Sequence, residues 1–100
     1  MSRELRVSSL AEKDLAEVFE WYKRRSAGLG TEFIKYVDAT VLLVQRSPLI
    51  FRKRVGEYRL AMTPRFPYAV YFIFDEIRDI VSIRRVLHFS QDRVVHLQKA

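Results

Sequence analysis

The sequence predicts an α+β fold with the order β-α-α-β-β-β, in which a helical hairpin packs on a twisted antiparallel sheet. Two stretches of the first half carry an apolar residue every three or four positions, which is typical of amphipathic helices. The second half consists of β-branched and aromatic runs separated by turn residues, as strands are. The 100 residues, 49% of them hydrophobic, suffice for one core. We therefore expect residues 1–100 to form a single domain.

The chain is expected to begin with a short strand and a long helix. Leu5-Arg6-Val7-Ser8 alternates enough to predict the strand. Ser9 and Glu12 have the spacing of a capping box, in which each side chain accepts a hydrogen bond from the other residue's backbone amide. The helix is predicted over about residues 10–26. Its apolar stripe consists of Leu15, Val18, Phe19 and Tyr22.

A second helix is predicted between Gly28-Leu29-Gly30 and Ser47-Pro48, where proline cannot continue the helix. Gly28 is suited to the left-handed conformation that ends the first helix. Because the loop is short, the two helices must form an antiparallel hairpin. Neither stripe can be buried by its own helix, so both should face the sheet. The second stripe consists of Phe33, Ile34, Val37, Val41 and Val44.

Three strands are predicted over Tyr58–Thr63, Tyr68–Asp75 and Asp79–Phe89, as a meander with turns at 64–67 and 76–78. The middle strand is apolar on both faces, as expected for a central position. We expect helices and sheet to share one core, which includes Leu15, Phe19, Ile34, Val37, Val41, Val70, Phe72 and Ile83.

The charge of the chain predicts an acidic partner, either nucleic acid or protein. The net charge is +6 and the pI is about 10.0. Residues 51–100 carry 10 basic and 5 acidic side chains, against 8 and 7 in residues 1–50. Arginine outnumbers lysine 13 to 5, and its planar fork suits bidentate contact with phosphate or carboxylate.

Two segments carry the candidate site residues. The run Arg52-Lys53-Arg54 and the following strand residue Arg59 could contact phosphates, although a solvated loop would look the same. Strict alternation on the last strand would place Ser82, Arg84, Val86 and His88 on one face and Val81, Ile83, Arg85 and Leu87 on the other. Arg84 and His88 would then be about 13 Å apart, and a bulge would change this arrangement. His88 could act as a general acid, but a lone histidine at a strand end more often makes a structural hydrogen bond.

Several classes of chemistry have no counterpart in the sequence. The chain has no cysteine and only two histidines, so neither a disulfide nor a metal centre is expected. A glycine-rich phosphate loop and a serine-histidine-acid arrangement are also missing, and no cofactor is expected. The N-terminus lacks the apolar run of a secretory signal, and no segment has the length and apolarity of a membrane span. These features predict a soluble, cytoplasmic protein without a membrane partner.

Taken together, the motifs resemble the RelE/ParE superfamily, the toxins of bacterial type II toxin–antitoxin pairs. The resemblance extends over nearly the whole chain and implies the same hairpin-on-sheet fold. It also implies a toxin that arrests growth, has a role in plasmid stabilisation and assembles with its cognate antitoxin into a hetero-oligomer. The segments that carry it are Ser9-Leu10-Ala11-Glu12-Lys13-Asp14-Leu15, Gly28-Leu29-Gly30, Ser47-Pro48, Arg65-Phe66-Pro67-Tyr68-Ala69-Val70-Tyr71 and Val86-Leu87-His88.

Two departures from the nuclease pattern favour one branch of this superfamily. RelE-like members cleave messenger RNA on the ribosome, whereas ParE-like members inhibit DNA gyrase. Ala61 and Tyr68 stand where the nuclease pattern has basic residues. His88 matches the histidine that some nuclease members use and also the Val-Leu-His ending common in ParE-like members. The resemblance therefore favours a non-enzymatic, ParE-like gyrase inhibitor.

Two alternatives remain open. One is a ribosome-dependent endoribonuclease that uses Arg59 as phosphate clamp, Arg84 as charge stabiliser and His88 as proton donor. The other is a degenerate member that binds only its antitoxin. The antitoxin is expected to be an acidic segment that folds on binding, with an affinity that falls as salt rises. For the toxin's target we expect contacts from Arg52, Lys53, Arg54, Arg59, Arg65 and Arg84.

Overall fold

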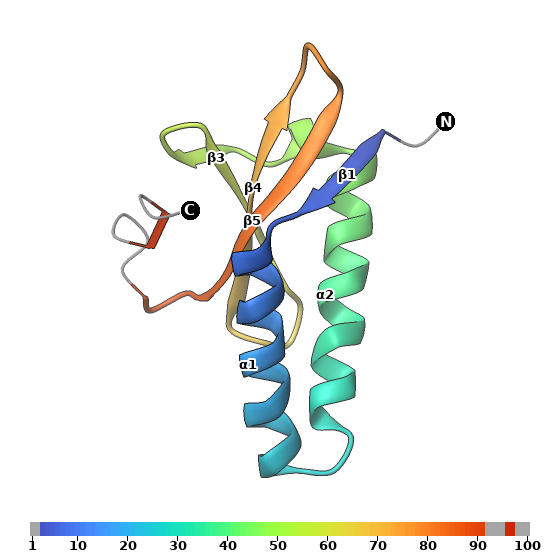
Figure 1. Cartoon of the computed structure of the whole chain (residues 1–100), viewed down its shortest axis with the longest axis vertical. Helices are drawn as coiled ribbons and strands as arrows, with labels where there is room; N and C mark the ends of the chain where they lie inside the picture. The colour runs from blue at the N-terminus through green and yellow to red at the C-terminus, as the bar shows by residue number, and fades with distance from the viewer. Residues whose placement is uncertain (1–2, 92–95, 98–100) are drawn as a thin grey trace.

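The computed structural model describes residues 3–91 and 96–97, and it shows a helical hairpin against one face of a five-stranded sheet (Figure 1). The α+β class and the helical hairpin predicted from the sequence are confirmed. In chain order the elements are β1 (Glu4–Val7), α1 (Ser9–Arg25), α2 (Leu29–Arg46), the 3-10 turn η1 (Pro48–Ile50), β2 (Lys53–Val55), β3 (Tyr58–Met62), β4 (Tyr68–Asp75) and β5 (Ile80–His88).

The sheet has the strand order β1-β5-β4-β3-β2. Strands β3, β4 and β5 form the predicted antiparallel meander, and β2 adds to its outer edge. At the opposite edge β1 pairs in parallel with β5, with Leu5 opposite Val81 and Val7 opposite Ile83. The sheet is therefore mixed rather than wholly antiparallel. Periodicity could not show this, because it reports which face of a strand is buried and not which strand lies beside it.

The first helix begins one residue earlier than expected, because the N-cap is Ser8 and not Ser9. The Ser8 hydroxyl accepts a hydrogen bond from the Ala11 amide at 3.0 Å and donates one to the Arg84 carbonyl at 2.8 Å. The predicted capping box at Ser9 is thus wrong. The reason is tertiary, since only Ser8 lies against β5, where its hydroxyl ties the start of α1 to the sheet.

The two helices approach closely at Gly30, the second glycine of the predicted loop. A Cβ atom at this position would lie 2.7 Å from the Phe19 carbonyl oxygen and 3.1 Å from the Phe19 ring. Gly28 has a different role, since its φ of +82° is the left-handed conformation expected between the helices. Glycine at position 30 therefore sets the distance between α1 and α2.

Replacing Gly30 with alanine is expected to lower the free energy of unfolding by about 1–3 kcal/mol, because the added methyl group meets backbone and cannot be accommodated by rotation of a side chain. Urea denaturation of the purified variant would measure this loss. Gly28→Asn is the matched control, since asparagine tolerates left-handed backbone and no atom lies within 4 Å of the added Cβ. Equal losses in both variants would contradict the role given to Gly30.

The main core lies between the helices and the sheet. Of the eight core residues predicted, Val37, Val70, Phe72 and Ile83 are buried. The other four are partly buried: Leu15, Ile34 and Val41 pack against the core, and Phe19 packs on Gly30. Phe33, from the predicted stripe of α2, is fully buried at its centre.

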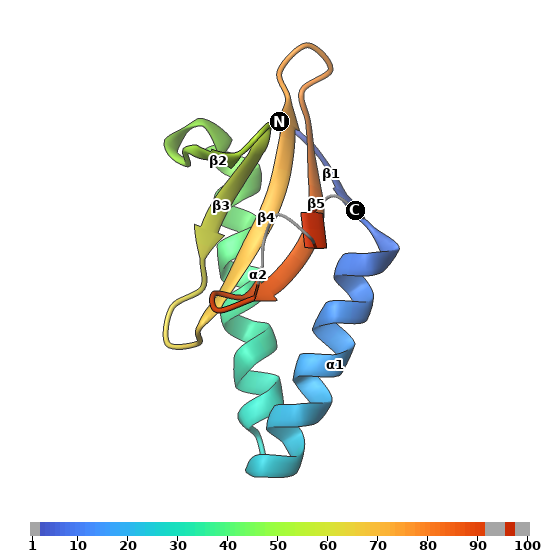
Figure 2. The ribbon, with the colours of Figure 1, turned by 90° about the vertical axis from the view of Figure 1, so that its left-hand side faces the viewer.

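The face of the sheet turned away from the helices has a smaller core of its own. Leu97 lies on this face and is only 4% exposed, and its carbonyl accepts a hydrogen bond from the Tyr58 hydroxyl at 3.3 Å. Figure 2 shows the last described residues beside β5. The members of this smaller core are Ala69, Tyr71, Leu87 and Leu97, with Val55, Tyr58 and Leu60 packed beside them.

Within the described part of the chain, no helix has the length and apolarity needed to cross a membrane.

Candidate functional site

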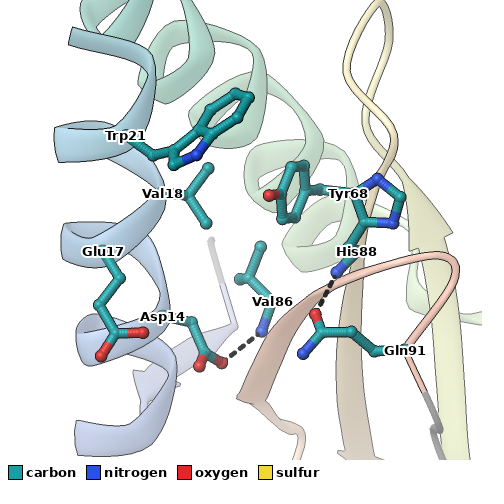
Figure 3. Close-up of a pocket in the computed structure, with 8 residues that line it drawn as sticks. All are labelled: Asp14, Glu17, Val18, Trp21, Tyr68, Val86, His88 and Gln91. Carbon is teal, nitrogen blue, oxygen red and sulfur yellow. Dashed lines mark hydrogen bonds between the residues drawn. The ribbon is translucent and has the colours of Figure 1, made fainter. Parts of the chain in front are cut away.

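A groove of about 380 Å³ lies between α1 and the end of β5, and Figure 3 shows the side chains that form it. We call it the α1–β5 groove. Its volume is in the range of sites that hold a small ligand or a large side chain. The lining residues come from three segments far apart in the sequence, so the groove exists only in the folded chain. They are Asp14, Glu17, Val18, Trp21, Tyr68, Val86, His88 and Gln91.

One wall of the groove is a single face of α1. Asp14, Val18 and Trp21 follow one another at spacings of four and three, which places them on the same side of the helix. The Trp21 side chain is 47% exposed, although it contacts the Tyr22 ring edge-on at 5.0 Å. The Arg25 guanidinium lies 4.2 Å from the centroid of the Trp21 ring. Trp21 therefore lies at the rim of the groove.

The opposite wall is shaped by a β-bulge in β5. Tyr71 pairs with Arg85 while Phe72 pairs with Ile83, so Arg84 is the extra residue. Beyond the bulge Val86 packs in the same core as Val81 and Ile83. The alternation predicted for this strand is therefore wrong from Arg84 onward, and His88 lies on the helix side.

His88 is fixed in position by contacts with its neighbours. Its ring contacts Tyr68 edge-on at 5.2 Å and stacks on Phe89 at 4.9 Å. The Ser90 amide donates a hydrogen bond to Nδ1 at 3.1 Å, and the Ser90 hydroxyl oxygen lies 2.7 Å from the same nitrogen. The His88 amide donates to Oε1 of Gln91 at 2.7 Å. These contacts fit the structural role that the sequence favoured for His88.

Asp14 connects α1 to the free edge of β5. Its carboxylate accepts two hydrogen bonds from the Arg85 guanidinium, both at 2.8 Å, and one from the Val86 amide at 2.9 Å. The side chains of Arg85 and Asp14 are only 12% and 11% exposed. The hydrogen-bonded Asp14 carboxylate raises the pKa of Arg85 above its ordinary value. Asp14 thus supplies a hydrogen-bond acceptor to the Val86 amide, on the part of the β5 edge that β1 is too short to cover.

The Asp14–Arg85 pair was not found from the sequence. The available signal was Arg85 itself, which strict alternation placed among the apolar residues Val81, Ile83 and Leu87. A charged side chain on a predicted buried face needs a partner of opposite charge. The identity of that partner depends on how α1 packs against β5, and the sequence pattern does not report it.

The three residues proposed for a nuclease are not brought together. Arg59 pairs with Phe72 and His88 pairs with Tyr68, which is four residues away along β4, or about 13 Å. The guanidinium of Arg59 donates to the Phe51 carbonyl at 2.8 Å. Arg84, at the bulge, lies between these two positions on the sheet.

The predicted target-binding residues divide into separate groups. Arg52, Lys53 and Arg54 are exposed at the edge formed by β2. Lys53 pairs with Glu57 at 2.7 Å, and this hydrogen bond lowers the pKa of the exposed Glu57 carboxyl. Arg59, on the neighbouring strand, completes this first group.

Arg65 lies apart from the basic edge, in the turn between β3 and β4. It is exposed, with its guanidinium 3.9 Å from Glu32 and 5.6 Å from the centroid of the Tyr36 ring. Arg84 is partly buried in β5. Four of the six predicted target-binding residues therefore lie in or beside β2 and β3, away from His88.

The groove beside His88 has the opposite character. Its lining includes two carboxylates, Asp14 and Glu17, and no lysine or arginine. Burial raises the pKa of the Tyr68 phenol, with a smaller contribution from Tyr22. Among the described residues there is no cluster of three or more histidine, cysteine or acidic side chains suited to a metal ion. The groove is thus aromatic and acidic, whereas the chain as a whole is basic.

Comparison with known proteins gives consistent results. Residues 5–93 match the family model described as the ParE toxin of the type II toxin–antitoxin system parDE. No curated protein sequence matches the chain significantly.

Three solved toxin–antitoxin structures share the fold. The chromosomal ParDE system of P. aeruginosa matches with a TM-score of 0.73 and 16% identity over 87% of this chain and 96% of that one. RelBE2 of Mycobacterium tuberculosis has a TM-score of 0.64 and 20% identity, over 88% of this chain and 99% of that one. The RelE–RelB complex of Pyrococcus horikoshii has a TM-score of 0.52 and 14% identity, over 92% and 100%.

Proposed function

Because the chain belongs to the family of ParE toxins of type II toxin–antitoxin systems, we propose that it arrests growth by inhibiting DNA gyrase and is neutralised by a cognate antitoxin. The proposal treats the toxin as a binding protein and not as an enzyme. The main support is the character of the α1–β5 groove, which His88 lines together with aromatic rings and two carboxylates and without any lysine or arginine.

RNA cleavage through attack by a 2′-hydroxyl needs a base, a proton donor and cations for the charge that develops on the phosphate. Beside His88 the groove presents Asp14 and Glu17, which would repel a phosphate. Arg59 pairs with Phe72, four residues along β4 from Tyr68, and its guanidinium is hydrogen-bonded to the Phe51 carbonyl. This arrangement supports a toxin that acts without bond cleavage.

The two departures from the nuclease pattern also support the proposal. Ala61 is 1% exposed and belongs to the core beneath the helices, so a basic side chain at this position would be buried in apolar surroundings. Tyr68 packs edge-on against Phe33 and His88. Both positions therefore serve packing rather than phosphate binding.

A ribosome-dependent endoribonuclease is the second candidate, because His88 lines the groove and histidine is a residue type that serves as a general acid. Two assays distinguish the candidates. Purified toxin should inhibit supercoiling of relaxed plasmid by gyrase, and it should leave messenger RNA intact on programmed ribosomes. Cleavage of the messenger without gyrase inhibition would replace the proposal with the nuclease. Absence of toxicity on expression would indicate a member that binds only its antitoxin.

Replacing His88 with alanine is expected to leave toxicity largely intact, because the proposed action needs no proton donor. Reversing the charge at Arg59 or Arg84 with glutamate should reduce toxicity, since binding an acidic target depends on their charge and fork geometry. Growth arrest after induction should be compared at matched levels of soluble protein, with Arg24→Glu on the exposed face of α1 as the charge control. A folded His88→Ala variant that lost toxicity together with codon-dependent mRNA cleavage would overturn the ParE-like assignment.

A further inference from the structure

We propose that the α1–β5 groove binds the side chain of one arginine, or less tightly a lysine, presented by the antitoxin. The inference rests on the antitoxin part of the proposed function and is independent of gyrase. It concerns one basic residue within a segment that is expected to be acidic overall.

The first argument is electrostatic. In a chain of net charge +6, the groove is lined by two carboxylates and by neither lysine nor arginine. Asp14 is already bound by Arg85 and the Val86 amide. Glu17 makes no ion pair with any described residue, so its carboxylate remains available to a cation from outside.

The second argument is the set of aromatic rings. Trp21, Tyr68 and His88 line the same groove as the two carboxylates, and Trp21 lies one helical turn from Glu17 on α1 (Figure 3). The face of an aromatic ring attracts a guanidinium or ammonium group, most strongly in tryptophan. The chain already shows this preference, because the guanidinium of Arg25 lies over the Trp21 ring.

The third argument is the shape of the groove. Val18 and Val86 supply apolar surface to the groove beside the carboxylates and the rings (Figure 3). Long cationic side chains lay their methylene stems on apolar surface and extend the charged group beyond it. An arginine fits better than a lysine, because its planar group can stack on a ring while its N–H groups reach a carboxylate.

These features would give the complex specificity. The basic edge at Arg52 and Lys53 attracts any acidic segment, but the α1–β5 groove accepts only a segment with a cation at the right position. Complementary charges of both signs align a partner and disfavour others, because a misplaced acidic residue would face Glu17. An exposed tryptophan is also a residue type that often dominates binding energy in interfaces.

The test uses the whole toxin and its purified cognate antitoxin, encoded by the reading frame beside the toxin gene. Glu17→Gln should weaken antitoxin binding about tenfold, the usual size of one lost charge pair at an interface. Glu20→Gln is the matched control, since Glu20 is an exposed carboxylate on the same helix that does not line the groove. Its affinity should stay within about twofold of the parent.

Two further measurements identify the ligand group. Trp21 is the only tryptophan, so its fluorescence should change when a tryptophan-free antitoxin binds. Among antitoxin variants with each arginine or lysine changed to glutamine in turn, one should lose about as much affinity as Glu17→Gln. Combining that change with Glu17→Gln should add little further loss, because both remove the same contact.

The proposal is overturned if Glu17→Gln and Glu20→Gln behave alike, if Trp21 fluorescence is unchanged in the complex, or if no basic residue of the antitoxin couples to Glu17. Circular dichroism of each variant separates loss of folding from loss of contact. A toxin that failed to inhibit gyrase would refute that part of the proposed function, while these binding results would still decide the inference about the groove.

Discussion

Replacing Asp14 with alanine is expected to lower the free energy of unfolding by about 3–5 kcal/mol, which is typical when one partner of a buried ion pair is removed. The change leaves the Arg85 guanidinium mostly buried without its carboxylate and leaves the Val86 amide without an acceptor at the edge of β5. Chemical denaturation with urea, followed by far-UV circular dichroism, would measure the loss.

The double variant Asp14→Leu with Arg85→Met is the informative control. It removes both charges and fills a similar volume, so it should cost clearly less than Asp14→Ala alone. Since the pKa of Arg85 is raised, its share of the stability is present at all pH values below the arginine's ordinary pKa and is lost only in strong alkali. A loss below about 1 kcal/mol in Asp14→Ala would show that the pair contributes no more than a surface ion pair.

Phe33→Ala should also cost about 3–5 kcal/mol, because truncating a buried phenylalanine loses apolar burial and leaves a cavity. The Phe33 ring is fully buried and contacts Phe66 and Tyr68 with centroid distances of 5.3 Å each. The cavity would open directly beneath Tyr68, which lines the α1–β5 groove. We therefore expect weaker antitoxin binding in addition to the loss of stability.

The size of this effect is checked against two other variants. Phe33→Leu should retain most of the stability, since leucine fills much of the same space. Ile77→Ala should change stability by no more than about 0.5 kcal/mol, because Ile77 is 98% exposed at the turn between β4 and β5. Thermal denaturation of all three proteins under one buffer condition provides the comparison. Similar losses for Phe33→Ala and Ile77→Ala would contradict the position of Phe33 in the core.

The sequence by itself determined the parts of the fold that depend on local patterns. The apolar period of three to four residues predicted both helices to within a few residues, and the strand runs predicted the meander of β3, β4 and β5. Proline at position 48 ended the second helix as expected, and Gly28 adopted the predicted left-handed conformation. Such features follow from the sterics of neighbouring residues, so a short window of sequence contains the information.

Only the tertiary structure decided the features that depend on which elements meet. Three such features join residues more than 70 positions apart: the parallel pairing of β1 with β5, the hydrogen bond from the capping residue Ser8 to the Arg84 carbonyl, and the Asp14–Arg85 pair. The bulge at Arg84 turned His88 toward α1, and a single extra residue reversed the faces that alternation had assigned. The α1–β5 groove is therefore a property of packing. Its acidic and aromatic lining could not be inferred from the basic composition of the chain, because composition carries no information about distance.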